Sequence, residues 1–202
     1  MKRIAALCCA AALLLSLCAC AGGQKNESPA LYIEKAQLTA QEEDIAELLG
    51  EKADAHQIYD FVVDDTVQRL QVNFYQMVDG QWDRTSGSDQ AFTDGKGRIA
   101  FQFDRIPDGV RVALQSEHAG GSYTYLGQPD AVLPGGCATS RLSDRTSILY
   151  EEEIPLVLQV VTAKNEVVSY QTDYFFQPEE LDALGYEGVY AITIRFSQTP
   201  LS

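Results

Sequence analysis

The chain has 202 residues, 46% of them hydrophobic, and a formal net charge of −14. This apolar content is sufficient for a sizeable core and argues against disorder over the main body. Such a negative chain is repelled by phosphate backbones and by anionic lipid headgroups, which argues against nucleic acid as a partner and against a domain lying flat on a membrane.

The N-terminus has the pattern of an export signal. Lys2 and Arg3 supply positive charge, and the uncharged run Ile4–Leu17 follows them. A helix of this run would be about 21 Å long, which is shorter than the ~30 Å hydrocarbon core of a membrane. We therefore expect a cleaved signal peptide and not a membrane-spanning helix.

The run ends in Leu17-Cys18-Ala19-Cys20. These residues resemble the lipobox of bacterial lipoproteins, in which a leucine and then a small residue precede the cysteine that is lipidated. The resemblance implies a diacylglyceryl group on Cys20 and cleavage between Ala19 and Cys20. Cys18 fits less well, because Leu17 would stand where the family has a small residue. The alternative is an ordinary secreted protein cleaved near Ala21. The chain is also similar to uncharacterised lipoproteins of gut Firmicutes, which implies no activity.

This interpretation divides the chain into a signal peptide (1–19), a lipidated cysteine with a flexible linker (20–30), and a single β-rich domain (31–202). The mature chain would have 202 − 19 = 183 residues, and loss of Lys2 and Arg3 would change its net charge from −14 to −16. Because a doubly acylated protein stays on its membrane, we expect it on the extracytoplasmic face of the cell membrane. Cys137 would be the one thiol beyond the anchor, so no intramolecular disulfide is expected.

The first predicted element of the domain is an amphipathic helix over 36–50. Thr39 and Glu42 have the spacing of a capping box, and Gly50 can end the helix. Its apolar residues Ile45, Leu48 and Leu49 fall on one face, which we expect to pack on a sheet.

The apolar period then changes to two, which predicts strands over 58–63, 70–75, 99–103 and 110–114. Asp79-Gly80 predicts a hairpin that returns through Trp82, and Pro107-Asp108-Gly109 predicts a turn. The polar stretch 84–90 is predicted to be a mobile loop.

Further strands are predicted over 122–125, 154–162, 167–176 and 189–197, with a long loop over 127–145. Lys164-Asn165 is expected to form a hairpin, and Pro178 to open a short helix that Gly185 ends. Pro155 suggests an edge strand, and Glu151-Glu152-Glu153 a solvated run that protects such an edge.

The predicted fold is therefore mainly β: an antiparallel β-sandwich with one N-terminal amphipathic helix and a short helix before the last strand. The run Thr93–Phe101, followed by Ile106–Val110, resembles a motif of transthyretin-like and carboxypeptidase-regulatory-like β-sandwich modules on cell surfaces. That resemblance implies a sandwich of transthyretin-like or immunoglobulin-like type and no activity.

Candidate chemistry is sparse. Cys137, His118 and Asp144 could be combined as nucleophile, base and orienting acid, but sequence proximity gives them no common geometry. The acidic residues Asp60, Asp64 and Asp65 could gather Ca²⁺ at a strand end, although a solvated turn is the simpler interpretation. No motif indicates a metal site or a cofactor.

Aromatic side chains are the remaining candidates for binding. Trp82, Tyr123 and Tyr125 could form a stacking surface for a carbohydrate or a protein ligand, while the alternative is that they belong to the core or cover a sheet. We expect a non-enzymatic, membrane-anchored binding or interaction domain. An accessory or ligand-delivering subunit of a transporter or sensor is one alternative, and an enzyme that uses Cys137 is another.

Overall fold

The computed structural model describes residues 31–48, 57–127, 135–164 and 166–201. One sheet, called sheet A, contains β1 (Tyr32–Lys35), β2 (Gln57–Val62), β5 (Lys96–Gln102), β6 (Val110–Ser116), β7 (Gly120–Tyr125) and β9 (Thr146–Ser147). The other, sheet B, contains β3 (Arg69–Val78), β4 (Gln81–Ala91), β8 (Gly136–Arg141), β10 (Glu153–Thr162) and β11 (Gly188–Ser197).

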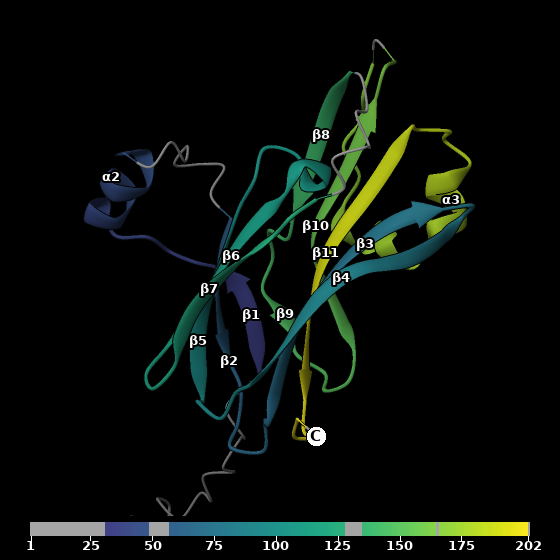
Figure 1. Ribbon diagram of the computed structural model, residues 1–202. Coiled ribbons are helices and arrows are strands. Elements are labelled where there is room, and N and C mark those ends of the chain that lie inside the picture. The colour runs from purple at the N-terminus through teal and green to yellow at the C-terminus, as the bar shows by residue number, and fades with distance from the viewer. Residues whose placement is uncertain (1–30, 49–56, 128–134, 165, 202) are drawn as a thin grey trace, which may run out of the picture.

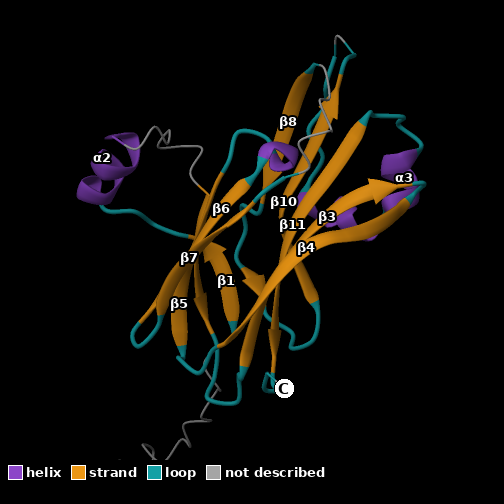
Figure 2. Cartoon of the chain, viewed as in Figure 1, coloured by secondary structure: helices purple, strands orange, loops and turns teal. Residues whose placement is uncertain are grey.

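The strand order is β7–β6–β5–β2–β1–β9 in sheet A and β4–β3–β11–β10–β8 in sheet B. The paired strands run antiparallel, and the two sheets pack face to face (Figure 1, Figure 2). The prediction of a mainly β, antiparallel sandwich of two sheets is therefore confirmed.

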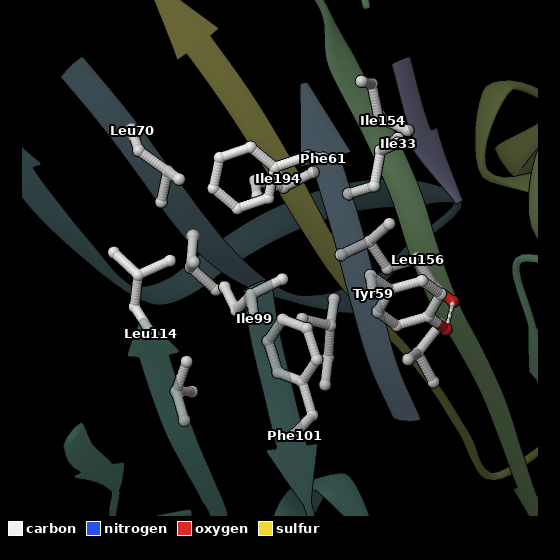
Figure 3. Packing of buried hydrophobic residues seen from close by; sticks show 14 of the residues in the cluster. Ile33, Tyr59, Phe61, Leu70, Ile99, Phe101, Leu114, Ile154, Leu156 and Ile194 are labelled. Carbon is white, nitrogen blue, oxygen red and sulfur yellow. Dashed lines mark hydrogen bonds between the residues drawn. The ribbon is translucent and has the colours of Figure 1, made fainter. Parts of the chain in front are cut away.

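The main core lies between the sheets, because alternate residues of each strand point inward. Phe61 of β2 packs against Phe196 of β11 and against Phe92, with ring centroids 5.1 Å and 5.3 Å apart. The buried Tyr59 hydroxyl donates to the Leu156 carbonyl oxygen at 3.0 Å and so joins β2 to β10 (Figure 3). These contacts hold sheet A against sheet B.

The strongly periodic strands and their turns are confirmed. Asp79 and Gly80 have φ angles of 50° and 73° and form the predicted two-residue turn between β3 and β4. Pro107 lies in the 3₁₀ turn η1 (Ile106–Asp108), and Gly109 then turns the chain with φ 124°. In β11 the residues predicted to share one face all lie in the main core: Tyr190, Ile192, Ile194 and Phe196.

The prediction of a mobile loop over 84–90 is wrong, because these residues belong to β4. Their backbone pairs with β3 from Val78↔Gln81 to Arg69↔Ala91, with a register shift next to Phe74. β4 lies at the edge of sheet B, where a strand needs little apolar content because one side meets solvent. Polar composition alone therefore does not indicate a loop here.

Two predictions in the second half are also wrong. The expected long loop over 127–145 contains strand β8, although 128–134 lie outside the described residues. The expected strand over 167–176 is irregular backbone followed by the 3₁₀ helix η2 (Thr172–Phe176). Asn165 of the expected hairpin also lies outside the described residues.

The segment between β10 and β11 covers the outer face of sheet B. The predicted short helix is present as α3 (Pro178–Asp182), and Gly185 follows it with φ 61°. Together, η2 and α3 bury a second apolar cluster whose buried members are Leu158, Val160, Phe175, Leu181, Val189 and Ala191. β10 and β11 are therefore apolar on both faces, which is why 166–187 form a cover and not another strand.

Pro155 does not mark an edge strand, because β10 lies between β11 and β8. The strand tolerates the proline because its register with β11 shifts between Pro155 and Val157, and its pairing with β8 begins only at Val157.

The acidic run that precedes Pro155 is also held in place. Glu153 accepts hydrogen bonds from Asn73 and Thr193, and Glu151 pairs with a guanidinium of β11.

Helix α2 (Ala40–Leu48) has the predicted cap at Thr39 but begins four residues later than the predicted bound of 36, since the Ala36 N–H donates to the Ile58 carbonyl oxygen at 2.9 Å. The Glu42 carboxylate accepts from the Thr39 N–H at 2.8 Å, and the Thr39 hydroxyl oxygen accepts from the Glu42 N–H at 3.3 Å, so the capping box forms. The hydrogen bonds from Thr39, together with that from the Arg98 guanidinium, lower the pKa of Glu42 to about 2.

The apolar face of α2 does not pack on a sheet as expected. Ile45 and Leu48 are 50% and 86% exposed, while Leu49 and Gly50 lie outside the described residues. Figure 1 shows the helix projecting away from the sheets. Its contact with sheet A is the ion pair between Glu42 and Arg98 of β5, at 2.7 Å. In the described ranges, no helix has the length and apolar character needed to cross a membrane.

Candidate functional site

A polar groove of about 460 Å³ lies beside strand β8. One wall is the end of β8 and the chain that leads to β9, and the other is the irregular segment before η2. The lining residues are Thr139, Ser140, Arg141, Leu142, Ser143, Asp144, Thr146, Ser169, Gln171, Thr172 and Asp173. Hydroxyl groups dominate this surface, so it is suited to hydrogen bonding.

Strand β8 is the edge strand of sheet B on this side. Its backbone pairs with β10 from Val157↔Arg141 to Thr162↔Gly136, and it pairs with no second strand among the described residues. The opposite edge, β4, carries several charges and a register shift, features that discourage further pairing. β8 has one charged side chain, Arg141, and no register shift in its ladder with β10.

Buried polar contacts hold β8 in position. Gln159 of β10 is fully buried, and its side-chain nitrogen donates to Thr139 Oγ1 at 2.9 Å. Its side-chain oxygen accepts from the Ile106 N–H at 2.8 Å, so the same glutamine also joins sheet B to the chain before β6. One wall of the groove is thus fixed to a fully buried residue.

Arg141 lies at the end of β8 that lines the groove. Its Nη1 donates weakly to the Thr139 carbonyl oxygen at 3.4 Å. Its Nε is buried and has no hydrogen-bond partner within the described structure. Because the Nε is buried, a ligand in the groove could be bonded only by the terminal nitrogens of this guanidinium. Asp144 and Asp173 add carboxylates to the same lining.

Trp82, one of the three predicted binding residues, lies on the outer face of sheet B. Its indole Nε1 donates to the Phe175 carbonyl oxygen at 2.7 Å, and its ring stacks on the Phe175 ring with centroids 5.0 Å apart. Tyr75 completes this aromatic group, with its ring centroid 5.4 Å from that of Phe175. Trp82 therefore anchors the cover formed by η2 and α3.

Tyr123 and Tyr125 point between the sheets instead. The Tyr123 hydroxyl accepts from Ser88 Oγ at 2.7 Å, and burial raises its pKa. The Tyr125 ring stacks on Phe74 with centroids 4.6 Å apart, and its hydroxyl donates to Thr85 Oγ1 at 3.3 Å. The two tyrosines link edge strand β7 to edge strand β4. The structure therefore does not bring them together with Trp82 on one surface.

The residues considered for catalysis also lie apart. Cys137 is an exposed free thiol on β8, and Asp144 lines the groove. His118 lies in the turn between β6 and β7, where its Nδ1 is 2.8 Å from the Asp94 carboxylate. Figure 1 shows that turn and β8 at opposite ends of the sandwich.

The acidic residues considered for Ca²⁺ have other partners. Asp60 pairs with Arg98 at 2.6 Å, and this hydrogen bond raises the pKa of the arginine. Asp64 accepts from Thr66 and from the Tyr150 hydroxyl, which together lower its pKa. Within the described ranges, no three His, Cys, Asp or Glu residues are grouped to hold a metal ion.

The groove is not predictable from the sequence, because one wall lies in the predicted loop over 127–145 and the other in the predicted strand over 167–176. The one signal in the sequence is the hydroxyl-rich run around 139–143. Cys20 and the other residues of the predicted lipobox, Leu17–Ala19, lie outside the described residues. Comparison with protein-family models, curated proteins and solved structures finds no match to this chain.

Proposed function

We propose that the protein is a lipid-anchored, extracytoplasmic and non-enzymatic binding protein whose sandwich takes an extended polypeptide in the groove beside β8. The observation that carries the proposal is the combination of a strand edge that pairs with no second strand among the described residues and a hydroxyl-lined groove of about 460 Å³. The lipobox at Leu17–Cys20 supports the anchor and the location.

A polypeptide fits this site better than a carbohydrate does. The edge of a sheet offers backbone donors and acceptors at the spacing of another strand, and strand addition is a common mode of peptide recognition. Ser140, Arg141 and Ser143 line the groove and carry side-chain groups that can bond a ligand's polar atoms. A flat aromatic platform would favour a sugar, but Trp82 lies on the outer face of sheet B, while Tyr123 and Tyr125 of sheet A point between the sheets.

Binding is preferred over catalysis because Cys137 and His118 come from opposite ends of the sandwich. We also propose a sandwich of immunoglobulin-like or transthyretin-like type. The run Thr93–Phe101 supports this fold type, because it leads through a turn into β5, as the family motif implies. Pro107 and Gly109 then form the turn into β6.

The test is selection of random peptides on the detergent-solubilised full chain, followed by measurement of Kd by fluorescence anisotropy. Ser143→Trp fills the groove at an exposed position, and Thr124→Trp places the same bulk on exposed edge strand β7 as a matched control. We expect Ser143→Trp to weaken binding at least about tenfold and Thr124→Trp to leave it unchanged.

A second comparison tests the mode of binding. Methylation of alternate backbone nitrogens in a selected peptide removes the donors that strand addition needs, so affinity should fall. Equal affinity of the methylated peptide, equal effects of the two tryptophan variants, or binding of glycans without peptides would overturn the proposal.

A further inference from the structure

A second cavity, of about 170 Å³, lies between the sheets where edge strands β4 and β7 face each other. It is separate from the groove beside β8 and shares no lining residue with it. The lining residues are Val72, Gln90, Ile99, Val112, Leu114, Gly121, Ser122 and Tyr123. None of these residues is charged.

The cavity exists because Gly121 stands at an inward-facing position of β7. Gly121 pairs with Leu114, just as Tyr123 pairs with Val112, and directly paired residues share one face of a sheet. Gly121 is exposed to solvent, and a Cβ built on it meets no atom within 4 Å. Among the residues of β7 that point between the sheets, position 121 is thus a glycine, and a large side chain there would fill the space.

The inner walls are apolar and rigidly placed. Val72, Ile99 and Val112 are each at most 1% exposed, and Leu114 is 8% exposed. Figure 3 shows Ile99 and Leu114 among the side chains that meet between the sheets. Gln90 and Ser122 are the more polar members of the lining, and the Tyr123 hydroxyl is held by Ser88 at 2.7 Å.

We propose that this cavity binds a small apolar molecule of about the size of one aromatic ring. An apolar protein cavity of about 150 Å³ accepts benzene, and the cavity here has a similar volume. Its inner walls are apolar, while the exposed residues Gly121 and Ser122 leave it open at the edge of the sandwich. Such a ligand would replace the missing Gly121 side chain and bury its apolar surface against the walls. The site does not depend on the peptide groove.

The test uses benzene as the probe on the detergent-solubilised full chain. In the wild-type protein, we expect benzene at ten times its Kd to raise Tm by about 3–6 °C. Gly121→Leu should raise Tm without benzene, because leucine fills the cavity, and should abolish the response to benzene. Gly120→Leu is the matched control, because Gly120 is exposed like Gly121 but lies on the opposite face of β7, so this variant should keep the response.

Methyl NMR provides a second measurement that needs no variant. Benzene should shift the methyl signals of Val72, Val112 and Leu114 but not those of Leu181 and Val189 on the outer face of sheet B. The proposal is overturned if benzene shifts neither group or both groups equally, or if Gly121→Leu retains the wild-type response.

Discussion

Gly97 of β5 lies against the core ring of Phe61, and this contact leaves no room for a side chain. A Cβ at position 97 would lie 2.5 Å from Phe61 Cζ, and the ring is itself fixed between Phe92 and Phe196. Gly97→Ala should therefore lower the free energy of unfolding by about 1–3 kcal/mol, measured from urea unfolding curves.

Gly95→Ala is the matched control for this prediction. A Cβ there meets its nearest atom, the Val63 carbonyl oxygen, at an ordinary 3.7 Å. Alanine at that position should be neutral or stabilise the protein by up to about 1 kcal/mol, because it restricts the unfolded chain. Equal losses in the two variants would contradict the packing argument.

The contact between Asp94 and His118 predicts a pH dependence of stability. Hydrogen bonds from Ser116 and His118 lower the pKa of Asp94 to about 2, and its bond to the carboxylate raises the pKa of His118 above 6.5. The contribution of His118 is complete below pH 6.5 and is lost as pH rises through its raised pKa. The contribution of Asp94 is complete above pH 3.8 and is lost as pH falls through about 2.

Asp94→Asn should remove both pH-dependent contributions to stability, that of His118 and that of Asp94. When the pH is raised from about 5.5 to about 8.5, the urea concentration at the unfolding midpoint should decrease. This decrease should be larger for the wild-type protein than for Asp94→Asn. An NMR titration should also show the pKa of His118 returning toward its ordinary value in Asp94→Asn. Superimposable pH profiles of the two proteins would show that this contact contributes nothing to stability.

At the scale of elements, the cover over sheet B offers a comparison of adjacent phenylalanines. Phe175 is 8% exposed and stacks on Trp82, whereas Phe176 is 61% exposed. Phe175→Ala should cost about 3–5 kcal/mol, and Phe176→Ala should cost less than about 1 kcal/mol. Urea unfolding followed by the fluorescence of Trp82, the single tryptophan, measures both. Similar losses of stability in the two variants would mean that the buried contact of Phe175 with sheet B does not stabilise the fold.

The same elements show how far sequence reasoning reaches. The alternation of apolar and polar residues predicts strands with one apolar face, such as β6. Residue types that tolerate positive φ angles predict turns such as Asp79-Gly80. β4 and β8 were not predictable, because an edge strand needs few apolar residues. β8 lines the groove, so the candidate site was missed together with its strand.

The sequence predicts a strand in the cover over sheet B, and this prediction is wrong because burial of distant residues decides the structure there. The sequence 167–176 has β-forming residues, but whether such a segment pairs as a strand or packs across a sheet depends on distant partners. Here the outward residues of β10 and β11, among them Leu158 and Val189, required burial. Local propensity carries no information about that requirement.

At the scale of the whole molecule, the proposed anchor has its own test. The full chain expressed in a bacterium should incorporate an alkyne fatty-acid label and partition into the membrane fraction, and Cys20→Ala should do neither. Cys18→Ala and Cys137→Ala are matched controls that should keep both properties. A label that persists in Cys20→Ala would contradict lipidation at that cysteine.

The position of β11 has a consequence for the order of folding. It lies between β3 and β10 in sheet B, although it follows both strands in the sequence. β3 and β10 therefore lack their common neighbour until residues 188–197 have left the ribosome, and β3 must pair across more than half of the chain. Sheet B therefore cannot close before β11 has been synthesised. Its completion depends on contacts between segments far apart in the sequence, which form more slowly than the local hairpin of β3 and β4.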